Sequence, residues 1–156
     1  MEILLTKTPS GALVPATEDE VEKMRRIKAG ATVRADVVQM RNYGFFAKWF
    51  ALARIAFEAW SETTPTLEYK GQPVLPDFER FRKDLTILSG FYRPVFNAKG
   101  ELRLEPESLK WGSMTEERFT QLFNATINAV LEKVLPRGRY TEAELRNLVD
   151  QVVAFG

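Results

Sequence analysis

The 156-residue chain contains no cysteine and no histidine. Without cysteine it cannot form disulfides, zinc ribbons, Cys-ligated iron–sulfur clusters or thiolate nucleophiles. Without histidine it lacks the usual general base near neutral pH and the commonest transition-metal ligand, so a Ser-His-Asp triad is excluded. The chemistry left to the chain is that of carboxylates with Mg²⁺, or of a Ser/Lys or Tyr-based site. The composition therefore favours a non-enzymatic protein with no cofactor and no bound metal.

The chain also lacks a long hydrophobic run. Its longest apolar stretch, residues 49–53, is far shorter than the about 20 apolar residues that a membrane span needs. No basic segment leads into an apolar run at the start of the sequence, so we expect no secretory signal. Hydrophobic residues make up 45% and charged residues 28%, which is typical of a soluble globular protein. We expect one cytoplasmic domain, residues 1–156, that does not bind membranes.

Charge of neither sign dominates, because 22 basic residues face 21 acidic ones and the net charge is +1. Overall steering toward nucleic acid is therefore weak. Basic residues nevertheless gather in residues 22–48 and 80–99, and a shared face would contact phosphates. The alternative is a pair of solvated faces, the first balanced by the acids of residues 18–22. The predicted nucleic-acid-binding residues are Arg25, Arg26, Lys28, Arg34, Arg41, Arg80, Arg82 and Lys83.

Hydrophobic periodicity predicts a single-domain α+β fold with about four or five helices packed on short antiparallel strands. Residues 2–7 and 31–39 are predicted to be paired strands. A capping box of Thr17 and Glu20 is predicted to open a short helix between them. Residues 91–96 and 101–105 flank a four-residue turn and predict a hairpin with Leu102 and Leu104 facing the core.

Residues 41–60 predict the central helix of this fold. They contain seven of the chain's eighteen aromatic residues (3 Trp, 4 Tyr and 11 Phe in all). Asn42 is placed to cap the helix. The helical spacing indicates a core stripe rather than a platform on which nucleic-acid bases stack. The stripe consists of Phe46, Trp49, Phe50, Ala53, Phe57 and Trp60.

Three more helices are predicted after this one. Asp77 is placed to cap a helix that ends near Leu88, and Thr115 is placed to cap a long helix over residues 116–135. A second capping box, Thr141 and Glu144, opens the last helix. Its predicted buried stripe is Leu145, Leu148, Val149, Val152 and Val153.

Several motifs together resemble an uncharacterised family of tailed-phage and prophage proteins, whose members lie near replication and recombination genes of lambda-like phages. The motifs are the opening ILLTKTPSGALVP, an RN followed by an FxxKxFAL-type helix, and the later run FRKDLTILSGFY…LEPESLKWGSM…FTQLF. The resemblance spans residues 1 to about 135. It implies a His-Arg-Lys-like run at the start of the central helix. Here Phe46, Ala47 and Lys48 occupy those positions, so only the lysine matches.

Residues 61–76 hold three prolines and one glycine, and we interpret them as a loop. Such a long connection is often functional, and its apolar residues Leu67, Tyr69 and Val74 are candidates for binding a partner protein. The alternative is a loop that covers the central helix. Trp111, between Lys110 and Gly112, is a further candidate anchor, although partial burial in the core is the competing interpretation.

Two other candidate sites involve charged residues. Arg137 and Arg139 lie in a turn ahead of a helix N-terminus, a place suited to anions, with a solvated helix connection as the alternative. The carboxylates that are candidate Mg²⁺ ligands show no diagnostic spacing. They are Asp36, Asp77, Asp84, Glu105 and Glu107.

These observations lead to three hypotheses of function. The first is a phage- or prophage-encoded, non-enzymatic accessory protein that binds DNA, RNA or nucleoprotein in replication or recombination. The second is an interaction protein that binds a host or phage protein, for example a component of a defence system. The third is a Mg²⁺-dependent nuclease that uses carboxylates.

Overall fold

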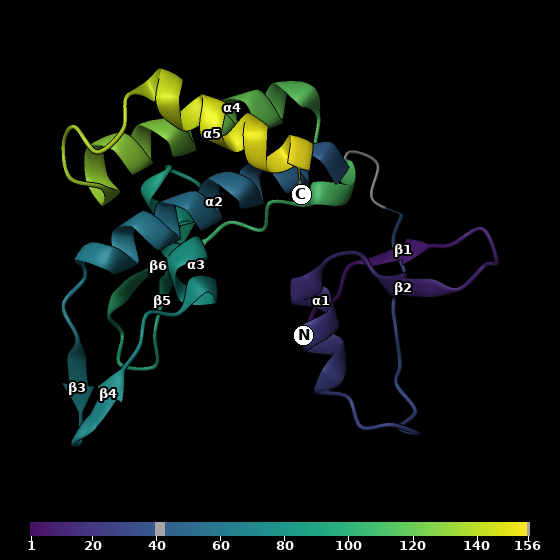
Figure 1. Ribbon diagram of the computed structural model, residues 1–156. Helices are drawn as coiled ribbons and strands as arrows, with labels where there is room; N and C mark the ends of the chain where they lie inside the picture. The colour runs from purple at the N-terminus through teal and green to yellow at the C-terminus, as the bar shows by residue number, and fades with distance from the viewer. Residues whose placement is uncertain (40–42, 156) are drawn as a thin grey trace. The chain divides into compact units, whose positions relative to one another are not determined.

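The computed structural model describes residues 1–39 and 43–155 (Figure 1). Within these residues the chain has five α-helices, one 3₁₀ helix, one π-helix and three two-stranded antiparallel sheets. This confirms the predicted α+β class. The chain divides into two compact units, Met1–Val37 and Val38–Gly156.

The first unit begins with a local hairpin. Strand β1 (Leu5–Lys7) pairs with β2 (Leu13–Pro15), with Thr6 opposite Val14. The turn signal at residues 9–11 reverses the chain, and the N–H of Gly11 donates to the carbonyl of Thr8 at 2.9 Å. The predicted pairing of residues 2–7 with residues 31–39 is wrong, because the latter segment has no regular secondary structure. A neighbouring strand closes a much shorter loop and so costs less chain entropy.

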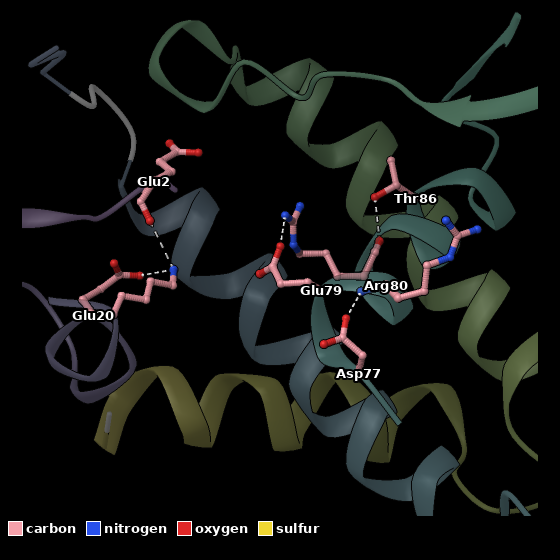
Figure 2. A network of polar contacts seen from close by, with 8 residues as sticks. Glu2, Glu20, Asp77, Glu79, Arg80 and Thr86 are labelled. Atoms are coloured by element: carbon pink, nitrogen blue, oxygen red, sulfur yellow. Dashed lines mark hydrogen bonds and ion pairs between the residues drawn. The ribbon is translucent and has the colours of Figure 1, made fainter. Parts of the chain in front are cut away.

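Helix α1 (Glu18–Arg25) follows this hairpin, but not through the predicted capping box. Thr17 is the N-cap residue and makes no side-chain capping hydrogen bond. Glu20 instead accepts a hydrogen bond from the N–H of Leu4 at 2.9 Å. Its carboxylate also pairs with Lys23 at 2.8 Å (Figure 2). This buried carboxylate therefore joins the start of the chain to α1.

The second unit is organised around α2 (Tyr43–Thr63), which has 21 residues. Its most buried positions are Trp49 and a row of small or aliphatic residues, among them Leu52, Ala53 and Ala56. The other aromatic members of the predicted stripe are only half-buried, and they pack sideways against neighbouring rings. Small side chains thus allow close helix packing, while the large rings fill one flank. The predicted cap Asn42 lies outside the described residues.

The other helices begin where their caps predict. The carboxylate of Asp77 accepts from the N–H of Arg80 at 2.7 Å and opens α3 (Phe78–Leu88). The hydroxyl of Thr115 accepts from the N–H of Arg118 at 3.2 Å and opens α4 (Glu116–Ala129). Thr141 and Glu144 form a reciprocal capping box, with bonds of 3.2 and 2.9 Å, at α5 (Glu142–Phe155).

Two helix predictions need correction. The predicted helix over residues 116–135 changes at Val130–Val134 into the π-helix η2. In α5 only Leu145 and Val149 of the predicted stripe are buried, whereas Val152 and Val153 are exposed. The last turn of α5 therefore extends beyond the core that its first turns cover.

A buried polar network holds three of these helices together. The indole N–H of Trp49 in α2 donates to the hydroxyl of Thr126 in α4 at 3.0 Å. That hydroxyl donates to the carbonyl of Leu122 at 2.7 Å, and the hydroxyl of Ser89, just after α3, lies 3.2 Å from it. Trp49 and Thr126 are both fully buried. The network satisfies a donor that would otherwise be stranded inside the core.

Residues 61–76 are not the predicted loop. Helix α2 continues to Thr63, and β3 (Leu67–Tyr69) then pairs with β4 (Gln72–Val74). The two-residue turn has positive φ at both positions, 51° at Lys70 and 76° at Gly71, which matches the twist of a tight hairpin. Figure 1 shows this hairpin extending away from the helices of its unit.

The third hairpin forms where predicted, but its orientation differs. Strand β5 (Tyr92–Phe96) pairs with β6 (Leu102–Pro106), and β6 lies next to α3. Leu102 and Leu104, predicted to face the core, are both exposed. The 3₁₀ helix η1 (Trp111–Ser113) connects this hairpin to α4.

Candidate binding surfaces

The basic residues predicted in the first unit differ in their partners. Arg25 forms an ion pair with Glu22 on the same helix. Arg26, Lys28 and Arg34 are exposed, and no acidic residue within the described ranges pairs with them. Arg41 lies outside the described residues. The first unit therefore offers three unneutralised cations within residues 26–34.

The basic residues predicted on α3 are mostly neutralised. Arg80 pairs with Asp84 at 2.8 Å. Arg82 pairs with Glu79 at 2.5 Å (Figure 2). The guanidinium of Arg82 also lies 5.6 Å from the centroid of the Phe50 ring. Lys83 is exposed and has no acidic partner in the described part of the chain. The two predicted basic groups thus belong to different units, and they differ in how many of their charges remain available.

Four of the five candidate carboxylates are engaged with different neighbours. Asp77 caps α3, and Asp84 pairs with Arg80. Glu105 pairs with Arg93 at 2.9 Å, and Glu107 pairs with Arg118 at 2.8 Å. Asp36 belongs to the other unit. Across residues 1–39 and 43–155, no three or more His, Cys, Asp or Glu side chains gather closely enough to hold a metal ion.

The turn between η2 and α5 contains the predicted anion-binding arginines. Arg139 pairs with Glu62 at the end of α2 at 3.1 Å, and its guanidinium lies 5.4 Å from the Tyr140 ring. An open pocket of about 340 Å³ lies beside it, lined also by Asn147 and Leu148. Arg137 is exposed and has no acidic partner among the residues described. Arg139 therefore ties this turn to α2.

Trp111 lies within an aromatic cluster on the flank of α2. Its ring centroid is 5.6 Å from that of Phe46, 5.7 Å from that of Trp49 and 6.2 Å from that of Phe50. The guanidinium of Arg54 covers the Phe78 ring at 3.7 Å. The cluster stabilises the packing of α2 against α3 and η1, because its rings contact one another. The side chain of Trp111 is half-buried.

The β3–β4 hairpin presents an apolar face to solvent. Leu67 lies opposite Val74, and Tyr69 follows Leu67 by two residues, so all three side chains share one face. Their exposed fractions are 59% for Leu67, 47% for Val74 and 67% for Tyr69. Leu75, which the sequence interpretation missed, directly follows Val74 and is also exposed. We call Leu67, Tyr69, Val74 and Leu75 the tip surface.

The β5–β6 hairpin presents a second apolar face, which alternation alone did not orient correctly. Phe96 lies opposite Leu102, and Pro94 lies opposite Leu104. Tyr92 and Pro106 complete the same face. The exposed fractions of its large side chains are 47% for Tyr92, 78% for Phe96, 59% for Leu102 and 45% for Leu104. We call Tyr92, Phe96, Leu102 and Leu104 the ribbon face.

These features define an α+β protein whose helical core carries two exposed apolar hairpins, with a small hairpin-and-helix unit before it. The chain belongs to the family described as "Protein of unknown function (DUF1367)", whose sequence model matches residues 1–76 and 70–155. No curated protein and no solved structure matches the chain. In the described part of the chain, every helix is too short or too polar to span a membrane.

Proposed function

We propose that this protein is a non-enzymatic accessory protein that binds another protein through the tip surface of the β3–β4 hairpin. The observation that supports the proposal is the exposure of four apolar side chains at residues 67–75, on a hairpin that extends from its unit (Figure 1). Clustered apolar side chains of this kind mark interaction sites in proteins. The proposed setting is the cytoplasm of a host cell in which a phage or prophage expresses the protein.

The chemistry of the tip surface favours a protein partner over nucleic acid. Lys70, in the turn of this hairpin, has its ammonium 5.3 Å from the Tyr69 ring centroid, and Glu68 directly precedes Tyr69 in β3. Two opposite charges so close together give little attraction for a polyanion. Pro73 has no N–H and interrupts the donors along β4. A partner is therefore expected to pack against the side chains rather than to extend the sheet.

Binding assays with matched variants test this proposal. Tyr69→Asp places a charge within the tip surface, and Gln121→Asp places the same charge on an exposed position of α4. A protein isolated with the native chain is identified, purified and titrated against each variant. We expect Tyr69→Asp to weaken binding at least tenfold and Gln121→Asp to leave the affinity unchanged. Equal affinity for both variants would show that the tip surface is not the binding site.

A second candidate function, nucleic-acid binding in replication or recombination, is supported by the unpaired cations Arg26, Lys28 and Arg34. The test measures the affinity for single- and double-stranded DNA and RNA at several salt concentrations. Removal of these three charges should reduce the slope of log K against log salt concentration for duplex binding by about 0.9 for each phosphate contact that is lost. Arg25→Ala is the control, because the Arg25 guanidinium is already paired with Glu22. A triple variant with an unchanged salt slope would exclude these cations as phosphate contacts.

A further inference from the structure

The charges of the first unit are segregated along the chain. Helix α1 begins with acidic residues and ends with basic ones. From residue 23 to residue 35 the sequence has five basic residues and no acidic one. Two of the five, Lys23 and Arg25, are paired with acids on the same helix. We call the other three, Arg26, Lys28 and Arg34, the basic segment.

The basic segment contains a turn rather than a regular helix or strand. The N–H of Ala31 donates to the carbonyl of Lys28 at 3.1 Å. Gly30, within this turn, has a φ of 78°, a conformation that glycine adopts readily. Every residue from 28 to 39 is exposed. The turn therefore keeps the three cations within a short, solvent-exposed stretch of chain, where closely spaced anions can meet them together.

The first unit has none of the side chains that stack on nucleic-acid bases. Residues 1–37 contain no Phe, Trp or Tyr, although these types are frequent in the rest of the chain. Proteins that bind single strands combine a basic groove with aromatic side chains on which successive bases stack. The same residues include no Asn or Gln, the side chains that read adenine in the major groove. The first unit is therefore suited to phosphates rather than to bases.

We infer that the basic segment binds double-stranded nucleic acid through its phosphates, without selecting a base sequence; this rests on the nucleic-acid-binding function proposed above. Both strands of duplex DNA contribute charge, so it carries one negative charge for about every 1.7 Å of helix axis, against about 3.4 Å for one strand alone. Three cations around one turn meet the closely spaced phosphates of a duplex more readily than those of a flexible single strand. A single strand also offers its bases, but the first unit has no ring to stack on them.

The expected salt dependence shows where the effect is best measured. Three phosphate contacts give slopes of log K against log salt concentration of about −2.7 for a DNA duplex and about −2.1 for a single strand. Between about 200 mM and about 50 mM salt, these slopes correspond to gains in affinity of about 40-fold and about 20-fold. The contribution of the basic segment is therefore largest at low salt, and larger for a duplex.

Fluorescence anisotropy with the full-length chain tests the inference. The probes are short labelled DNA duplexes, one rich in A·T and one rich in G·C, the separated strands of each, and an RNA duplex of matching sequence. At about 50 mM salt we expect duplexes to bind at least tenfold more tightly than single strands. The two DNA duplexes should have affinities within about threefold of each other. The DNA and RNA duplexes share the phosphate ligand, and their relative affinities identify which of the two the chain prefers.

Two triple variants with the same loss of charge assign the binding to one place in the chain. The first replaces all three residues of the basic segment by alanine. The second, Lys99→Ala/Lys110→Ala/Lys133→Ala, removes three exposed lysines of the second unit that have no acidic partner among the described residues. We expect the first variant to lose at least tenfold in duplex affinity at low salt and the second to lose less than about threefold.

The outcomes separate this inference from the function on which it rests. No binding to any of the probes at low salt would overturn both. Binding to single strands as tight as to duplexes, lost equally without the basic segment, would leave nucleic-acid binding standing and overturn the preference for duplexes. A strong preference for one DNA duplex sequence would overturn recognition through phosphates alone. Equal losses in the two triple variants would show that overall charge, and not the basic segment, is responsible, and would also overturn the inference.

Discussion

The bond from Trp49 to Thr126 provides the most direct test of how the second unit is held together. Thr126→Val keeps the shape of the side chain but removes the hydroxyl that accepts the indole N–H at 3.0 Å. Both residues are fully buried, so water cannot replace the lost acceptor. A buried donor left without a partner costs about 1–3 kcal/mol. We therefore expect Thr126→Val to lower the free energy of unfolding by about 2 kcal/mol.

The same helix supplies a matched control. The hydroxyl of Thr120 donates to the carbonyl of Glu116 at 3.0 Å, but its side chain is exposed and no distant helix depends on it. Thr120→Val should change the free energy of unfolding by less than about 0.5 kcal/mol. Urea unfolding followed by circular dichroism measures the free energy of unfolding of both variants. If this free energy falls with urea concentration at the same slope in both, the two variants expose similar surface on unfolding.

A double-mutant cycle separates the hydrogen bond from other effects of the valine. Trp49→Phe removes the donor, so Thr126→Val no longer strands an N–H in that background. We expect the effect of Thr126→Val to be smaller there by at least about 1 kcal/mol. If Thr126→Val costs no more than Thr120→Val, or costs the same with and without the indole, the bond does not stabilise the unit and our reasoning is wrong.

Other predictions concern local contacts. Glu20→Ala should destabilise the first unit by about 1–3 kcal/mol and speed hydrogen exchange at the amide of Leu4, because this amide loses its acceptor. Glu22→Ala, at an exposed position, is the control. An unchanged exchange rate at Leu4 in the Glu20→Ala variant would contradict the role of Glu20. Lys70→Asn should stabilise the β3–β4 hairpin by up to about 1 kcal/mol, because asparagine tolerates positive φ better; weaker cross-strand NMR contacts would refute this. Thr115→Ala and Thr141→Ala should each cost about 1 kcal/mol in thermal or urea unfolding. Thr17→Ala should cost little, because Thr17 makes no side-chain capping bond, and equal losses at all three sites would disprove the distinction.

The elements that were predictable from the sequence depend on neighbours a few residues away. The caps at Asp77, Thr115 and Thr141 are formed as expected, because each satisfies N–H groups in its own first turn. The pattern of Thr17 and Glu20 is equally suggestive, yet the Glu20 carboxylate bonds the distant N–H of Leu4. Sequence spacing shows that a side chain can reach a local donor. Sequence spacing does not show whether that side chain will bond a donor far away in the sequence instead.

The β3–β4 hairpin was missed although its signal is present in the sequence. Residues 67–69 and 72–74 flank the pair Lys70-Gly71, a two-residue spacing typical of tight hairpins. The prolines on either side favoured a loop, and Pro73 within the second run counts against a strand. An outward-facing edge position tolerates a proline, so the hairpin forms despite it. The interpretation of residues 67–74 as a candidate binding segment did not depend on this error.

The orientation of the β5–β6 hairpin depends on residues outside the alternating pattern. Alternation correctly groups Leu102 with Leu104 and separates them from Arg103. It does not determine which group meets the helices, and hydrophobicity alone favours the leucines. Phe91 decides the question, because its burial beside Arg118 places every second residue after it on the inner side. Exchange of the two faces would instead place Leu102 and Leu104 on the side of Phe91 and the helices. The leucines therefore remain in contact with water.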